Sequence, residues 1–178
     1  ISLNNIAFKE GSADYGGAIY SYGDVDVGNC SFVNCSTGKY GSGAIYMYHD
    51  FDYSGGKCNL VNSNFLDCSA DYGAAIYGCF ITVVDCNFVN CSSDRGGAIL
   101  WVANNEGFVV DCNFTDCLSY IDGGAIYWEE NAAGYIAGCN FLNCVLDYDL
   151  DEGEGGGGAI YSNGNEDCHL YNSSWNPQ

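Results

Sequence analysis

The stretch GGAIY at residues 123–127 decides the fold, because close copies of it recur along the whole chain. A second phrase, CNFTDC at 112–117 in this repeat, stands between the copies and has an aromatic residue at its centre. The GGAIY-type copies begin at residues 16, 42, 73, 96, 123 and 157. The aromatic anchors are Phe8, Phe32, Phe65, Phe88, Phe114, Phe141 and Trp175. Successive anchors are 23 to 34 residues apart. A repeat of this length that tolerates insertions is typical of a solenoid.

The residues before each anchor follow a strand pattern. Ile81 and Val83, seven and five residues before Phe88, alternate with period two, which indicates a strand. Asp85 stands where the apolar phase shifts, and other repeats have Asn, Asp or Gly there. Asn and Asp tolerate the left-handed conformation and favour a bend. GAIY predicts a third strand, which the chain enters through glycine.

Residues 1–178 are therefore predicted to form one all-β domain. We expect a right-handed parallel β-helix of about six and a half rungs, each with three short strands. The anchors and the isoleucine of each GAIY should point inward, although the opposite facing of the isoleucine strand remains open. An outward column is then expected at Tyr20, Tyr46, Tyr77, Tyr127 and Tyr161. Insertions at 48–57, 101–107 and 145–158 are expected to be surface loops.

The charge of the chain limits its partners. It has 23 acidic residues and four basic ones, with a formal net charge of -19. Four cations cannot make a basic face for nucleic acid, so no nucleic-acid partner is expected. We also expect no membrane insertion, because no apolar run reaches the roughly 20 residues of a membrane span. The sequence begins at Ile1 without an initiating Met, which suggests a mature chain or a fragment.

Twelve cysteines suggest an oxidising compartment. Most fall in two columns, two residues before and three after the anchor. Two cysteines of one rung lie about 10 Å apart or more, too far for a disulfide. Neighbours along a column lie about 4.8 Å apart and could bridge. The alternatives are a ladder of buried thiols or a soft-metal site, for which His49 and His169 are isolated. The disulfide candidates are Cys30, Cys35, Cys58, Cys68, Cys79, Cys86, Cys91, Cys112, Cys117, Cys139, Cys144 and Cys168.

Two further site types are suggested by residue patterns. Acidic residues near the glycine turns and in the last insertion could bind calcium, the only cofactor considered, or form a solvated acidic edge. The calcium candidates are Asp14, Asp71, Asp94, Asp122 and Asp151. Asn-X-Ser/Thr sequons could be glycosylated or could arise by chance in an Asn- and Ser-rich repeat. These sequons begin at Asn29, Asn34, Asn90, Asn113 and Asn172.

The alternation of GGAI with an FxxN-type phrase resembles two groups of surface proteins. FVN at 32–34 and 88–90 and FLN at 141–143 are similar to the repeats of chlamydial polymorphic membrane proteins. The GGAIY copies also resemble the adhesin-like and sheath-type surface proteins of methanogenic archaea. The resemblance covers essentially the whole chain, and it implies a β-helix and an extracellular, cell-surface location. The regular cysteine columns depart from both patterns.

Three functions are compatible with this sequence. The first is a non-enzymatic structural subunit of a surface filament, sheath or coat, in which uncapped solenoid ends stack end to end into a homo-oligomer. The second is an adhesin that binds a host or partner cell surface, or a glycan. The third is a polysaccharide-active β-helix enzyme. It is the least favoured, because such enzymes need clustered carboxylates or an Arg/Lys with calcium.

Overall fold

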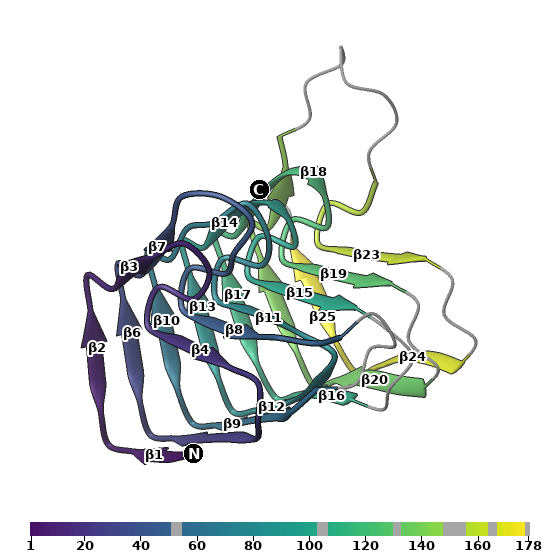
Figure 1. Cartoon of the computed structure of the whole chain (residues 1–178). Helices are drawn as coiled ribbons and strands as arrows, with labels where there is room; N and C mark the ends of the chain where they lie inside the picture. Colours follow the sequence, from purple (N-terminus) through teal and green to yellow (C-terminus); the bar gives the residue numbers. More distant parts are fainter. Residues whose placement is uncertain (51–54, 103–106, 130–132, 148–155, 164–166, 177–178) are drawn as a thin grey trace.

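The chain forms a parallel β-solenoid, in which each coil of the chain lies beside the next (Figure 1). The computed structural model describes residues 1–50, 55–102, 107–129, 133–147, 156–163 and 167–176. All regular structure in this part is β-strand, and every pairing between named strands is parallel. The predicted all-β solenoid is confirmed.

Three long sheets run along the solenoid. The first, which precedes the anchors, contains β1 (Ser2–Asn4), β5 (Val25–Gly28), β9 (Lys57–Val61), β12 (Phe80–Val84), β16 (Gly107–Val110), β20 (Ala133–Ala137) and β24 (Asp167–Tyr171). The anchor sheet contains β2 (Ala7–Lys9), β6 (Ser31–Val33), β10 (Asn64–Leu66), β13 (Asn87–Val89), β17 (Asn113–Thr115), β21 (Asn140–Leu142) and β25 (Ser174–Asn176). The tyrosine sheet contains β4 (Ile19–Ser21), β8 (Ile45–Met47), β11 (Ile76–Gly78), β15 (Ile99–Val102), β19 (Ile126–Glu129) and β23 (Ile160–Asn163).

A fourth, shorter row of strands follows the anchor sheet and was not predicted. These corner strands are β3 (Ser12–Ala13), β7 (Ser36–Thr37), β14 (Ser92–Arg95), β18 (Leu118–Asp122) and β22 (Val145–Leu146). They form a two-stranded sheet, β3 and β7, and a three-stranded sheet, β14, β18 and β22. Isolated bridges from Ser36 to Ser69 and from Ser69 to Ser92 connect these two sheets. The corner strands carry the chain from the anchor sheet to the glycine turn before the tyrosine sheet.

The coils stack in register, so that equivalent residues lie side by side. Phe65 pairs with Phe32 on one side and with Phe88 on the other. The centroids of adjacent anchor rings are 4.7–4.9 Å apart from Phe8 to Phe141, and the ring planes are within 6° of parallel. The four middle rings and the isoleucines from Ile45 to Ile126 are completely buried. The predicted inward facing of both columns is therefore confirmed. Trp175 keeps the register of the anchor column but is 57% exposed.

Left-handed bends shape each coil. The predicted bend positions all have positive φ, between 46° and 64°: Asn5, Asn29, Asn62, Asp85, Asp111, Gly138 and Asn172. A second set, two residues after the anchors, was not predicted as bends: Glu10, Asn34, Asp67, Asn90, Asp116 and Asn143, with φ between 52° and 56°. The same residue types serve both bends, because Asn and Asp accept this conformation most readily among side-chain-bearing residues.

A ladder of side-chain amides lies on the outer surface of the anchor sheet. The Nδ2 group of Asn87 donates to Oδ1 of Asn64 at 2.8 Å. Asn113 donates to Asn87 at 2.9 Å, and Asn140 donates to Asn113 at 3.0 Å. Each asparagine thus contributes to the register through its side chain as well as its main chain.

One predicted surface loop begins inside the core. Trp101 and Val102 belong to β15, the ring of Trp101 is completely buried, and Gly107 begins β16, so the prediction of a loop at 101–107 is wrong at both ends. The predicted loops at 48–57 and 145–158 likewise overlap β9 and β22. The indole of Trp101 stacks on that of Trp128 at 4.5 Å, and its Nε1 donates to the carbonyl of Cys79 at 2.9 Å. A Cβ atom at Gly107 would lie 2.2 Å from the Trp101 ring, which explains the glycine there. Residues 51–54, 103–106 and 148–155 of the insertions lie outside the described residues.

The anchor column predicts a large effect for one substitution. We expect Phe88→Ala to lower the free energy of unfolding by about 3–5 kcal/mol, since it leaves a cavity between two stacked rings. Chemical denaturation followed by circular dichroism measures this change. Phe108→Ala is the matched control, because that ring lies on the outer side of β16 and is only half buried. Equal losses in the two variants would contradict the assignment of the anchor column as the core.

Candidate functional site: the tyrosine groove

The outer face of the tyrosine sheet carries a column of aromatic rings. The isoleucine of each GAIY phrase points into the core, so the next residue points outward. Tyr46 and Tyr77 stack at 4.6 Å and 7°, and Tyr127 and Tyr161 stack at 5.0 Å and 15°. Tyr20 stacks on Tyr46 at 5.5 Å. The predicted outward tyrosine column is confirmed, although Tyr127 is almost completely covered by its neighbours.

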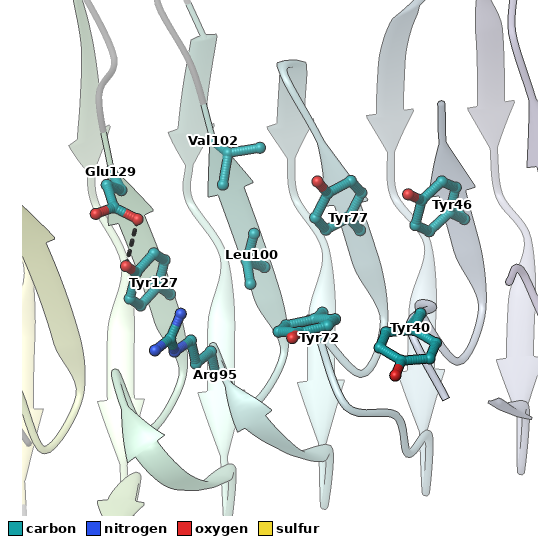
Figure 2. A pocket seen from close by; sticks show the side chains of 9 residues that line it. All are labelled: Tyr40, Tyr46, Tyr72, Tyr77, Arg95, Leu100, Val102, Tyr127 and Glu129. Carbon is teal, nitrogen blue, oxygen red and sulfur yellow. Dashed lines mark hydrogen bonds between the residues drawn. The ribbon is translucent and has the colours of Figure 1, made fainter. Parts of the chain in front are cut away.

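Leu100 interrupts this column. It pairs with Tyr77 of β11 on one side and with Tyr127 of β19 on the other, so it occupies the place of a tyrosine. The repeat at 96–100 reads GGAIL, whereas five other copies of the phrase end in tyrosine. The leucine side chain is smaller than a tyrosine, and together with Tyr77 and Tyr127 it lines a hollow on this face of the solenoid (Figure 2).

A second row of side chains faces this hollow from the corner of the solenoid. Tyr72 and Arg95 are neighbours in this row, because a parallel bridge joins them. Tyr40 lies beside Tyr72 on the next coil, and its main-chain N–H donates to Oδ2 of Asp71 at 3.3 Å (Figure 2). The corner row and the tyrosine column thus form two walls.

A groove of about 320 Å³ lies between these walls. We call it the tyrosine groove. Its described lining consists of Tyr40, Tyr46, Tyr72, Tyr77, Arg95, Leu100, Val102, Tyr127 and Glu129 (Figure 2). The groove is open to solvent, and aromatic rings and aliphatic side chains line it together with one cation and one anion. This combination of apolar walls with a few convergent polar groups is typical of a small-molecule site.

Arg95 supplies the positive charge of the groove. Its Nε lies 4.0 Å from Oδ2 of Asp122, a distance too long for a hydrogen bond, and this buried Nε has no hydrogen-bond partner among the described residues. The Cζ atom lies 5.8 Å from the centre of the Tyr127 ring. Since the side chain is 42% exposed, the guanidinium can donate to a ligand in the groove.

Tyr127 and Glu129 form the polar end of the groove. The hydroxyl of Tyr127 donates to Oε2 of Glu129 (Figure 2). Burial raises the pKa of Tyr127, and the hydrogen bond with Glu129 raises it further, so the phenol stays protonated at neutral pH. Burial also raises the pKa of Tyr46. Tyr46 and Tyr127 are therefore neutral rings at this face, and the carboxylate of Glu129 can accept hydrogen bonds.

The sequence pattern indicated only part of this site. It predicted the outward tyrosines, but not the roles of Arg95, Glu129, Tyr40 and Tyr72. His49, expected as an isolated surface residue, is half buried, and its Nε2 lies 2.7 Å from the hydroxyl of Tyr77. The visible signal was the leucine at position 100 in a column of tyrosines, which marks a departure from the repeat.

The cysteines form buried columns of free thiols. Eleven cysteines are described as free and buried, and no disulfide joins them. The Sγ atom of Cys68 lies 3.8 Å from the carbonyl oxygen of Phe32, and that of Cys117 lies 3.8 Å from the carbonyl oxygen of Phe88, each on a neighbouring coil. The structure thus shows the thiol ladder rather than the disulfides that the sequence also allowed. The side chain of Cys168 lies outside the described residues.

Burial keeps these thiols away from reagents in solvent. It raises the pKa of Cys79 to about 12, and it also raises the pKa of Cys58. The thiolate is the reactive form of cysteine, so a raised pKa slows alkylation and exchange. The sulfurs instead donate weak hydrogen bonds to carbonyl groups, such as that of Gly28 from Cys30 at 3.1 Å. The columns therefore behave as small apolar core residues.

The thiol ladder makes a prediction for cysteine titration. We expect at least eleven free thiols when protein purified without reducing agent is unfolded. In the native state, we expect almost none of these thiols to react. Ellman's reagent, with and without guanidinium chloride, measures both numbers. A count below eleven in the unfolded chain would contradict the thiol ladder and support disulfides between neighbouring cysteines of a column.

The acidic candidates do not form a cation site in the described part of the chain. No group of three or more His, Cys, Asp or Glu residues that could hold a metal occurs there. Asp71 accepts the N–H of Tyr40, and Oδ1 of Asp122 accepts the N–H of Gly156 at 2.9 Å. Asp14 is exposed and Asp94 lies in β14, whereas Asp151 lies outside the described residues. These positions give the calcium prediction no structural support.

The sequon asparagines occupy bends and one strand. Asn29, Asn34, Asn90 and Asn172 have positive φ, and Asn113 lies in β17. The amides of Asn29 and Asn90 donate to Asn4 at 3.0 Å and to Asp67 at 2.7 Å. The amide of Asn113 donates to Asn87. A glycan on these three would replace a ladder hydrogen bond. Asn34 and Asn172 are exposed, and glycosylation there stays a prediction.

Comparisons with known proteins add no relative. Neither a family model, nor a curated protein, nor a solved structure matches the chain. The resemblance to surface proteins with GGAI and FxxN repeats thus stays a prediction. Within the described residues, no helix is long and apolar enough to cross a membrane.

Proposed function

We propose that this chain is a non-enzymatic, extracellular binding protein of a cell surface, which holds a glycan of a partner cell in the tyrosine groove. The observation that carries the proposal is the groove itself, where the tyrosine column and the corner row bring aromatic rings together with the guanidinium of Arg95 and the carboxylate of Glu129. Sugars combine apolar C–H faces with hydroxyl groups, so such a mixture of rings, donors and acceptors suits them. Of the functions compatible with the sequence, this one is the adhesin.

The groove favours binding over catalysis. Glycoside hydrolysis uses two carboxyl groups on either side of the scissile bond. Among the described residues that line the groove, Glu129 is the single carboxylate, and it accepts the hydroxyl of Tyr127. The described lining therefore supplies a hydrogen-bond acceptor rather than an acid and base pair, and the polysaccharide-active enzyme is not favoured.

The proposal predicts that rim tyrosines contribute to glycan affinity. We expect the double variant Tyr40→Ala/Tyr72→Ala to weaken binding about tenfold or more, since each lost aromatic contact is worth about 0.5–1.5 kcal/mol. A glycan array selects the ligand, and calorimetry measures its affinity. Tyr135→Ala removes an exposed tyrosine from the first sheet, away from the groove, and should leave affinity unchanged. Wild-type protein that binds no glycan would overturn the proposal.

A second candidate function is end-to-end stacking into a filament, sheath or coat. The observation that favours it is the exposed apolar layer that contains Leu170 (59% exposed), Tyr171 (50%) and Trp175 (57%). With Phe141 and Ile160, Leu170 and Trp175 line a hollow of about 300 Å³. Ile1, in the opposite end layer, is 65% exposed. Open strand edges next to apolar side chains are suited to pairing with another copy.

Stacking predicts a concentration-dependent size. We expect the chain to sediment as a mixture of monomers and linear oligomers whose mass rises with concentration. Trp175→Lys should shift this equilibrium toward monomer, because the new charge would be buried on stacking. Tyr135→Lys, on the side of the solenoid, is the matched control. A monomer at all concentrations in analytical ultracentrifugation would contradict the stacking proposal and leave the groove proposal untouched.

A further inference from the structure

Tyrosine side chains gather on the outer surface of the coils that contain β4 and β8, which lie side by side (Figure 1). Tyr20 of β4 pairs with Tyr46 of β8. The main-chain N–H of Tyr48 donates to the carbonyl of Ser21 at 2.8 Å. The parallel register thus continues for one residue beyond both strands, and it places Tyr22 next to Tyr48.

The rings of Tyr22 and Tyr48 make the closest contact between two tyrosines in the described part of the chain. Their centres are 4.4 Å apart, and their planes are inclined by 43°. The rings of Tyr46 and Tyr77, by comparison, are 4.6 Å apart and nearly parallel, at 7°. When two phenols are joined carbon to carbon beside their hydroxyl groups, the ring centres have about this separation, and crowding at the joint twists the planes. Tyr22 and Tyr48 therefore already have the spacing and inclination of a coupled pair.

Solvent reaches this pair from the side of Tyr22. Tyr22 is 64% exposed, whereas Tyr48 is half buried. The hydroxyl of Tyr20 donates to the hydroxyl oxygen of Tyr22 at 3.1 Å, and these two rings meet edge to face at 5.3 Å. Tyr22 is thus held between Tyr20 and Tyr48 while most of its side chain stays accessible. An oxidant outside the protein can take an electron there, and water can take the phenolic proton.

Most other readily oxidised side chains are buried. The described cysteines, Trp101, Trp128 and Met47, which is the one methionine of the chain, all lie in the core. Trp175 is exposed, but it lies on the last strand of the anchor sheet, several coils away from β4 and β8. One-electron oxidation of the folded protein at these two coils is therefore directed to tyrosine.

We propose that Tyr22 and Tyr48 form an oxidative cross-linking site, at which a haem peroxidase with hydrogen peroxide joins two neighbouring coils through a dityrosine bond. Each phenol loses one electron and one proton, and hydrogen peroxide accepts both pairs and becomes two water molecules. The two phenoxyl radicals form one carbon–carbon bond between their ortho carbons. The ortho hydrogens then leave as protons, and the oxygens are protonated again, so both phenols are restored. This inference does not depend on glycan binding, since neither residue lines the tyrosine groove.

The bond links the coil of β4 covalently to the coil of β8. The eleven cysteines described as free provide no such link, so main-chain pairing and side-chain packing hold these coils together before oxidation. A cross-link removes conformations from the unfolded chain, as a disulfide does. We expect the coupled protein to unfold at a temperature about 5 °C or more above that of the untreated protein.

The test treats the folded protein, at micromolar concentration, with a haem peroxidase and hydrogen peroxide. Because the two rings are already in contact, the bond within one molecule should form at least about a hundredfold faster than bonds between molecules. We expect dityrosine fluorescence and a monomer that has lost two hydrogen atoms by mass spectrometry. Trypsin then cleaves after Lys39, which separates residues 10–39, with Tyr22, from residues 40–57, with Tyr48. These two peptides should be recovered as one joined species after unfolding and thiol alkylation.

Matched variants identify the pair. Tyr22→Phe and Tyr48→Phe keep a ring but remove the phenolic hydroxyl, so each should lose the joined peptides almost completely. Tyr15→Phe is the control, because that ring lies 5.6 Å from Tyr20 and from Tyr46, and it should retain them. If a variant fails to unfold cooperatively, fragment-ion sequencing of the joined wild-type peptides identifies the two linked residues directly.

The outcomes decide between this pair and general surface oxidation. Joined peptides that disappear in both pair variants and persist in Tyr15→Phe support the site, as does a fragment-ion assignment to Tyr22 and Tyr48. Joined peptides that persist in folded Tyr22→Phe or Tyr48→Phe overturn it. Dityrosine that forms only between molecules, that links another pair of residues, or that does not form at all overturns it as well.

Discussion

The in-register pairing of one coil with the next determines the rest of this structure. Main-chain bonds such as Asn64 N–H to the Cys30 carbonyl, 2.9 Å, and Asn87 N–H to the Ser63 carbonyl, 3.0 Å, repeat at every anchor. Parallel strands in exact coil-to-coil register place each residue beside its own counterpart. The sequence must therefore consist of side chains that are stable next to copies of themselves. Phenylalanine rings, asparagine amides and thiols all satisfy this condition, which is why the chain repeats them.

The same pairing sets limits on size at the turns. A Cβ atom at Gly97 would lie 2.0 Å from the carbonyl oxygen of Gly124, and one at Gly124 would lie 2.0 Å from that of Gly158. Close approach of the main chains thus requires glycine at Gly97 and Gly124, although the copy at 73–77 has Ala74 at the same position. The first glycine of the phrase takes a positive φ in four coils, at Gly73, Gly96, Gly123 and Gly157. A large side chain at one position can also require a glycine at another position nearby. The indoles of Trp101 and Trp128 fill the volume that a side chain at Gly134 would otherwise occupy.

These rules explain how much the sequence could predict. The recurrence of an aromatic residue at the position of Phe88 predicts the register and the core column. The recurrence of Asn, Asp or Gly at the position of Asp85 predicts the bend. Neither recurrence reports which columns meet across a corner, so the neighbourhood of Arg95, Tyr72 and Glu129 was not predicted. Trp101 was assigned to a loop because it lies outside the repeated phrase. The cysteine columns were located correctly, but spacing alone could not decide between thiols and disulfides, which depend on sulfur positions.

A uniform repeat offers little to a small ligand, because every outward side chain is covered on both sides by its own copy. Tyr46, for example, has Tyr20 on one side and Tyr77 on the other. A recess requires a coil that departs from the repeat, and Leu100 is such a departure in the tyrosine column. The polar residues near it, Arg95 and Glu129, are departures as well, since arginine occurs once in the chain. In this solenoid the repeated phrase therefore makes the scaffold, and the positions that depart from it are where specific binding is to be sought.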